Sequence, residues 1–88
     1  MSVRVVVPGQ LRAYTGGAAE VEAEGGTLGA VLLDLDARYP GFRFRIIDEQ
    51  DRVRRHILLY VGEEREERLD APVPAGRAIT IVGALSGG

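Results

Sequence analysis

The stretch Ala78-Ile79-Thr80-Ile81-Val82 leads through Gly83 into Ala84-Leu85-Ser86-Gly87-Gly88. Its first part is rich in β-branched residues, which predicts a strand. Gly87 and Gly88 carry no side chain, so they can lie in a narrow tunnel and bring a terminal carboxylate against another protein's active site. We therefore expect a folded domain over residues 1–83, a flexible tail over residues 84–88, and a reactive carboxylate on Gly88.

This carboxylate needs help from outside the chain. A carboxylate is a poor electrophile, and it enters acyl chemistry only after a partner has given it a good leaving group, such as an acyl-adenylate. The sequence contains no machinery for that step. The alternative is that Gly87 and Gly88 are an inert, frayed end, since small residues are common in disordered termini.

The composition describes one small globular domain. Of the 88 residues, 45% are apolar and 27% are charged, and the chain is long enough for a single modest core. A net charge of −2 argues against nucleic acid and against an anionic membrane as partners, because both attract a cationic face. We find no apolar run of membrane-spanning length and no signal-peptide pattern, and we expect a cytoplasmic protein.

The chain lacks two reactive residue types. Cysteine is absent, which excludes disulfides, thiolate metal sites and thiol nucleophiles. Lysine is absent too, and all 11 basic residues are arginine. One interpretation is that a chain with an activated glycyl carbonyl is safer without amines that attack it. The other is the codon bias of a GC-rich genome.

The N-terminal half predicts a β-hairpin followed by a helix. Residues 3–7 are a β-branched run and residues 19–24 alternate small or apolar side chains with acids, so each segment predicts a strand. Between them we expect a loop that contains Leu11, Arg12 and Tyr14 and ends in the turn signal Thr15-Gly16-Gly17. Thr27 stands where a helix N-cap belongs. The predicted helix has an apolar stripe at helical spacing, formed by Leu28, Val31, Leu32, Leu35 and Tyr39.

The second half predicts further strands. Residues 42–55 are irregular and indicate a short turn of helix or an extended linker. Residues 56–61 are apolar on both faces, as in a central strand. The charged residues 63–68 predict a solvated turn and a short edge strand that reaches Leu69, and residues 78–82 predict the last strand. This order predicts an α+β fold of the β-grasp type, in which one main helix covers one face of a mixed sheet of four to five strands. Its first and last strands are parallel at the centre.

Alternation along the strands divides the sheet into two faces. We expect the helix to cover the face that carries Val3, Val5, Val7, Ile57, Leu59, Val61, Ile79 and Ile81. The opposite face then presents an apolar set that no second helix covers, the open-face patch, formed by Val6, Leu58, Tyr60 and Val82. Exposed apolar patches mark protein interfaces, although scattered exposed apolar residues are ordinary. We predict that the open-face patch binds a partner.

The polar residues predict no catalytic or metal-binding constellation. His56 is the only histidine and stands at the start of a strand, where we expect a structural role. Four glutamates within residues 63–67 accompany arginine in a turn, which indicates a solvated charged run rather than a metal site. We expect no bound metal. Arg52, Arg54 and Arg55 either belong to a solvated loop or steer an acidic partner to the tail.

Several segments together resemble one known family. They are a Val-Arg-Val-Val-Val-Pro strand at residues 3–8, Leu11-Arg12, Thr15-Gly16-Gly17, a helix start at residues 27–31 and the Gly-Gly terminus. In this order they resemble the ubiquitin-like sulfur carriers of the MoaD/ThiS superfamily, which have the ubiquitin-like β-grasp fold. The likeness covers essentially the whole chain, including Arg55-His56 and Tyr60-Val61. It is greatest to the carrier used by the actinobacterial O-phosphoserine-dependent cysteine synthase.

The resemblance implies a cycle of sulfur transfer. An ATP-using, E1-like adenylyltransferase would adenylate the carboxylate of Gly88, and sulfide or a persulfide would displace AMP to leave a C-terminal thiocarboxylate. A second partner would hold the sulfur acceptor. In the cysteine-pathway form the acceptor is an aminoacrylate on the pyridoxal phosphate of a cysteine synthase, and a metalloprotease later releases cysteine. The chain would be a co-substrate, monomeric when alone and without a cofactor of its own.

The tail departs from the family before Gly87. The family often has a proline or another small residue and then Ala-Val-Ala or similar, where this chain has Gly83-Ala84-Leu85-Ser86. We therefore expect Ala84, Leu85 and Ser86 to bind a partner and to tune which tunnel accepts the tail.

Three interpretations stay open. The chain is a sulfur carrier for cysteine, molybdopterin, thiamine, a thiolated tRNA base or a secondary metabolite; or it is a modifier joined to lysines of target proteins; or it is an interaction module with an inert tail.

Overall fold

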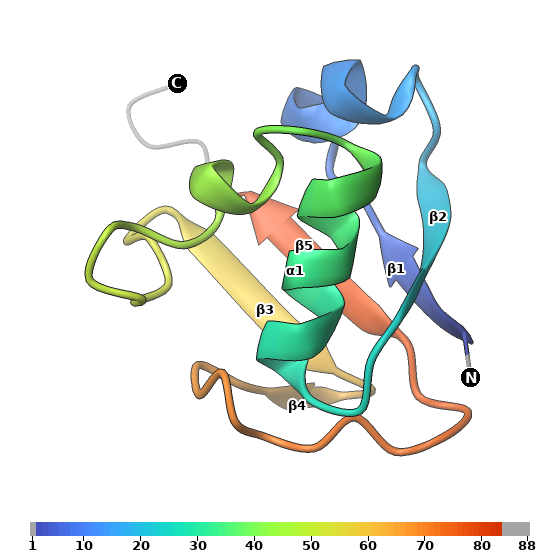
Figure 1. Cartoon of the computed structure of the whole chain (residues 1–88), viewed down its shortest axis with the longest axis vertical. Helices are drawn as coiled ribbons and strands as arrows, with labels where there is room; N and C mark the ends of the chain where they lie inside the picture. The colour runs from blue at the N-terminus through green and yellow to red at the C-terminus, as the bar shows by residue number, and fades with distance from the viewer. Residues whose placement is uncertain (1, 84–88) are drawn as a thin grey trace.

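The computed structural model describes residues 2–83. Within this range five strands form one mixed sheet: β1 (Ser2–Val6), β2 (Glu20–Glu24), β3 (Ile57–Val61), β4 (Glu64–Arg65) and β5 (Ile79–Gly83). The spatial order is β2-β1-β5-β3-β4. Helix α1 (Leu28–Arg38) crosses one face of the sheet, and two short 3₁₀ helices, η1 (Gly9–Thr15) and η2 (Arg43–Arg45), lie in the connections (Figure 1). The predicted β-grasp fold is confirmed.

The first and last strands lie side by side at the centre of the sheet. They are parallel, with Val5 opposite Ile79 and Val6 opposite Thr80, as predicted. β1 also pairs antiparallel with β2, which confirms the hairpin. β5 pairs antiparallel with β3 along its whole length. The final strand is therefore held between two neighbours.

Helix α1 begins at the predicted cap. The Thr27 hydroxyl accepts a hydrogen bond from the Ala30 amide at 3.2 Å, which satisfies one donor of the first turn. The side chains that face the sheet are fully buried: Leu28, Val31, Leu32 and Leu35. Burying one such side chain stabilises a fold by about 1.5–3 kcal/mol, so this stripe holds the helix on the sheet.

One of the two irregular connections differs from the sequence expectation. Residues 9–15, an expected loop, form η1, which buries Leu11 against the core. Residues 42–55 contain the single turn η2, which is one of the two predicted alternatives, and here Phe42, Ile46 and Ile47 are fully buried and close one end of the core. These segments have no helical or strand periodicity because their shape depends on distant contacts.

The edge of the sheet differs in one detail. β4 has only two residues, Glu64 and Arg65, and does not reach Leu69. Val61 packs against the core on the covered face, as predicted, and it is only partly buried because it also lines an open pocket at that end of β3. Within residues 2–83, no helix has the length and the apolar character needed to cross a bilayer.

Candidate functional site

The last described residue, Gly83, directly precedes the predicted tail, residues 84–88. It lies opposite Ile57, the first residue of β3. The predicted reactive residues Gly87 and Gly88, and the predicted partner-binding residues Ala84, Leu85 and Ser86, lie outside the described residues. The structure thus places the root of the tail at a defined corner of the sheet, where β3 starts and β5 ends.

Gly83 lies directly beneath the side chain of Gln10 from η1. A Cβ atom added at Gly83 would overlap the Gln10 amide group. Any larger residue at position 83 therefore has to displace Gln10. The 3₁₀ helix that sequence periodicity missed thus packs against the root of the tail.

The open-face patch forms as predicted, on the face of the sheet away from α1. Leu58 and Val82 lie directly opposite each other, and Tyr60 lies opposite Thr80, which in turn lies opposite Val6. Val82 is 38% exposed, and the other three patch residues are half-buried. Thr80 bridges the patch but was not predicted as part of it, although it stands two positions before Val82 on the same face.

Charged side chains border the open-face patch on both sides. Glu20 of β2 lies opposite Val6 and is 3.9 Å from Arg4, while Arg65 of β4 lies opposite Tyr60. All three charged residues are exposed. An apolar centre with a charged rim is the usual anatomy of a protein interface.

A second surface lies beside the root of the tail. Phe44, Arg45, Arg54 and His56 line a shallow pocket of about 160 Å³, here called the tail-side pocket. His56 directly precedes Ile57, the residue opposite Gly83. His56 was expected to be structural, but it is exposed and lines this pocket.

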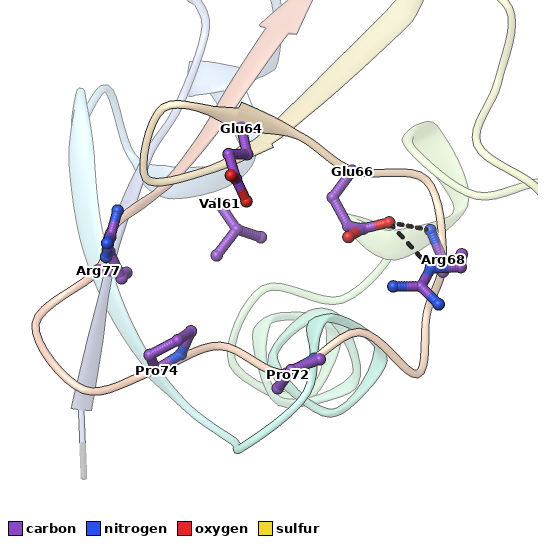
Figure 2. Close-up of a pocket in the computed structure, with 7 residues that line it drawn as sticks. All are labelled: Val61, Glu64, Glu66, Arg68, Pro72, Pro74 and Arg77. Carbon is purple, nitrogen blue, oxygen red and sulfur yellow. Dashed lines mark hydrogen bonds and ion pairs between the residues drawn. The ribbon is translucent and has the colours of Figure 1, made fainter.

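A larger pocket lies at the opposite end of β5 from the tail (Figure 2). It encloses about 280 Å³ and is lined by Val61, Glu64, Glu66, Arg68, Pro72, Pro74 and Arg77. Val61 lies opposite Ile79, the first residue of β5, whereas the tail begins after the last residue of that strand. This pocket therefore does not adjoin the root of the tail.

Glu66, one of the acids that line this pocket, is paired within its own loop. The Glu66 carboxylate accepts hydrogen bonds from the Arg68 and Glu67 amides, both at 3.0 Å, and from the Arg68 guanidinium at 3.4 Å. These contacts, with the Arg68 amide first, lower the pKa of Glu66. Across residues 2–83, no three acidic, histidine or cysteine side chains are grouped in a way that would hold a metal ion.

Sequence comparisons identify relatives along the full length of the chain. The family model described as the ThiS family matches residues 5–88. Sulfur carrier protein CysO from Mycobacterium tuberculosis is 38% identical over 93 aligned positions, which cover 100% of both chains.

Solved structures agree with these relatives. The crystal structure of M. tuberculosis CysO superposes with a TM-score of 0.88 at 36% identity, covering 94% of this chain and 99% of that one. A chain of the Amycolatopsis orientalis BexX/CysO complex gives a TM-score of 0.89 at 36% identity, covering 98% and 99%. Small archaeal modifier protein 1 from Methanosarcina acetivorans shares the fold, with a TM-score of 0.80 at 24% identity over 99% and 96% of the two chains.

Proposed function

Because the chain belongs to the ThiS family, we propose that it is a sulfur carrier protein that carries sulfur as a thiocarboxylate on Gly88. The observation that carries this proposal is the full-length similarity to Sulfur carrier protein CysO, at 38% identity. The family match extends through Gly87 and Gly88. The chain is a carrier rather than an enzyme, since it supplies the group on which its partner enzymes act.

The chemistry divides between this chain and its partners. An adenylating enzyme joins the Gly88 carboxylate to the AMP part of ATP and releases pyrophosphate. A sulfur nucleophile then attacks the glycyl carbonyl carbon, forms the C–S bond and expels AMP as the C–O bond breaks. The product has one oxygen and one sulfur on the same carbon, and it donates that sulfur to an acceptor held by a second enzyme.

The composition supports this placement of the sulfur. Proteins often carry transferable sulfur as a persulfide on cysteine, but this sequence contains no cysteine. It also contains no lysine, so an activated Gly88 has no lysine amine of its own chain to acylate. The terminal carboxylate is therefore the group that we propose for sulfur loading.

The scaffold supports delivery of the tail to partner enzymes. Five residues follow Gly83, and a fully extended segment of that length reaches at most about 18 Å. A partner that receives Gly88 in its active site must therefore lie close to the tail end of the sheet. We propose that the open-face patch forms part of the surface that such partners contact.

We propose cysteine synthesis as the destination of the sulfur, with a pyridoxal phosphate-dependent cysteine synthase as the second partner and a metalloprotease as the third. The similarity to CysO supports this choice. Molybdopterin, thiamine or a secondary metabolite is the alternative acceptor, and the partner enzymes encoded beside the gene are expected to distinguish these.

The proposal is tested by incubating the chain with the adenylating enzyme of the same organism, ATP and sulfide, and measuring the intact mass. We expect an increase equal to the replacement of one oxygen by sulfur. Branched peptides on lysines of other proteins would instead support a protein modifier. An unchanged mass in the presence of an enzyme that consumes ATP with a known carrier would overturn the proposal.

A further inference from the structure

We propose that the tail-side pocket, formed by Phe44, Arg45, Arg54 and His56, docks a carboxylate-bearing surface of the adenylating enzyme, beside the opening through which that enzyme admits the tail. This inference rests on the proposed function, since it requires a partner that receives Gly88. The adenylating enzyme is the occupant because activation precedes transfer to any acceptor.

The tail-side pocket lies beside the end of the sheet from which the tail departs. The Ile57 amide donates to the Arg54 carbonyl at 3.0 Å, and Ile57 lies opposite Gly83 in the sheet. The pocket residues Arg54 and His56 thus flank the strand end from which the tail departs. A tail that reaches at most about 18 Å keeps any enzyme bound to Gly88 close to this corner.

The two arginines of the pocket are held in place by neutral groups. Arg54 donates from Nε to the Phe44 carbonyl at 2.7 Å, and its guanidinium carbon lies 4.4 Å from the centroid of the Phe44 ring. Arg45 donates from Nε to the Tyr14 hydroxyl and lies 5.7 Å from the centroid of that ring. Both contacts engage Nε and leave the terminal amino groups of each guanidinium for a ligand.

Neither arginine forms an ion pair within the described residues, although the charge of Arg54 is the smallest of the causes that lower the pKa of Asp48. Among residues 2–83, no acidic side chain lies within 4.0 Å of the guanidinium of Arg45 or Arg54, whereas neighbouring Arg43 pairs with Asp51 at 3.4 Å. A guanidinium with two unpaired amino groups in one plane matches a carboxylate, which can accept two parallel hydrogen bonds. Because the arginines are already ordered, binding loses less side-chain entropy.

The charge distribution favours an acidic partner. Residues 42–56 carry five arginines against three acidic residues, while the whole chain has 11 basic and 13 acidic residues. The corner beside the tail is thus locally cationic on an otherwise acidic protein. Such a separation of charge orients association with a surface of opposite sign.

The pocket also offers apolar area beside its two arginines. Phe44 is 56% exposed, and exposed aromatic residues beside arginine are the combination enriched in interface centres. His56 lies in the turn directly before β3, two residues along the chain from Leu58 of the open-face patch. The exposed ring of Phe44 therefore gives the cationic pocket an apolar contact area of its own.

The test compares charge reversals at the two ends of β5. Arg45→Glu and Arg54→Glu alter the tail-side pocket, and Arg77→Glu makes the same change in charge at the far pocket shown in Figure 2. Binding to the adenylating enzyme is measured by calorimetry at low and high salt. We expect both pocket variants to bind about tenfold more weakly, with a shallower salt dependence, and Arg77→Glu to stay within about twofold of the unaltered chain.

Separate control experiments test whether each variant is folded and whether the chain is loaded with sulfur. Thermal unfolding shows whether each variant is folded, and Arg54→Lys, which keeps the charge but loses the planar fork, is expected to bind with intermediate affinity. The inference is overturned if the folded Arg45→Glu and Arg54→Glu chains bind no more weakly than Arg77→Glu. If the unaltered chain binds the enzyme but is never loaded with sulfur, the proposed function fails while the docking comparison still stands.

Discussion

At the scale of single residues, Asp34 joins elements that are distant in sequence. Its carboxylate accepts a hydrogen bond from the Glu24 amide at 2.8 Å and another from the Arg38 guanidinium at 2.7 Å. These contacts link α1 to the end of β2 and, with the Glu24 amide first, lower the pKa of Asp34 below its ordinary value of 3.8. Helical spacing predicts that Asp34 faces away from the core. It does not predict the contact with Glu24, because that residue lies outside the helix, at the end of β2.

The lowered pKa of Asp34 makes part of the stability dependent on pH. A carboxyl group whose pKa is lower in the folded state stabilises the fold above its unfolded pKa, and that stabilisation is lost as pH falls through the folded pKa. We therefore expect the free energy of unfolding to decline as pH drops below about 4. Asp34→Asn is expected to lower stability at neutral pH and to make the decline shallower. Urea unfolding across a pH series measures both effects.

Part of this decline is expected to remain in the variant, because hydrogen bonds from backbone amides also lower the pKa of Asp48 and Glu66. If the stability of the Asp34→Asn chain and that of the unaltered chain fall in parallel between about pH 5 and pH 2, the role given to Asp34 is contradicted.

At the scale of elements, the junction between β2 and α1 depends on a close approach of two backbones. A Cβ atom at Gly25 would lie 2.7 Å from the Val31 amide nitrogen and 2.9 Å from the Ala30 carbonyl carbon. The next residue, Gly26, has no atom within 4 Å of the corresponding position. Two adjacent glycines that look equivalent in the sequence thus have different structural roles.

This difference gives a matched pair of substitutions. Gly25→Ala is expected to lower the free energy of unfolding by about 1–3 kcal/mol, because helix backbone cannot move aside as a side chain can. Gly26→Ala is expected to change it by less than about 0.5 kcal/mol. Equal losses in denaturant unfolding would show that the junction is not the tight contact described here.

The open face of the sheet is an element whose effect is expected in binding rather than in folding. Tyr60→Asp places a charge in the centre of the open-face patch, and we expect it to weaken binding to the adenylating enzyme by at least about tenfold. The melting temperature of the Tyr60→Asp chain is expected to change by about a few degrees only, because Tyr60 is already partly exposed to solvent. Calorimetry and thermal unfolding measure the two quantities.

Leu33→Asp is the control for this substitution. Leu33 is 61% exposed on α1, on the other side of the sheet, so the same kind of change there is expected to leave binding unaltered. A Tyr60→Asp chain that loses stability and binding to the same degree would mean that the two faces of the sheet have been assigned wrongly.

The sequence predicts the helices and strands whose own residues show a periodic or β-branched pattern. The β-branched runs of β1 and β5, the alternation of β2 and the stripe of α1 each indicate one element and one buried face. η1 and η2 carry no such signal, since buried Leu11 and Phe42 are fixed by the core they complete. The tail-side pocket was missed for the same reason: its residues converge only after the connection between α1 and β3 has folded.

At the scale of the whole molecule, the proposed function places folding and chemistry in different parts of the chain. The described core residues lie between Val3 and Ile81, and β5 leads from this core to the root of the tail. Deleting Gly88 is therefore expected to abolish sulfur loading while the thermal unfolding transition stays within about one degree of the unaltered chain. A large loss of stability on this deletion would mean that the tail is structural.

The central claim is that the sulfur resides on the C-terminal carbonyl of Gly88. Tandem mass spectrometry of the loaded chain tests this most directly, because fragmentation assigns the added mass to one residue. We predict that every fragment containing Gly88 carries one sulfur in place of oxygen and that fragments ending before Gly88 are unchanged. Added sulfur on a fragment that lacks Gly88, or loading of a chain from which Gly88 has been deleted, would contradict the account.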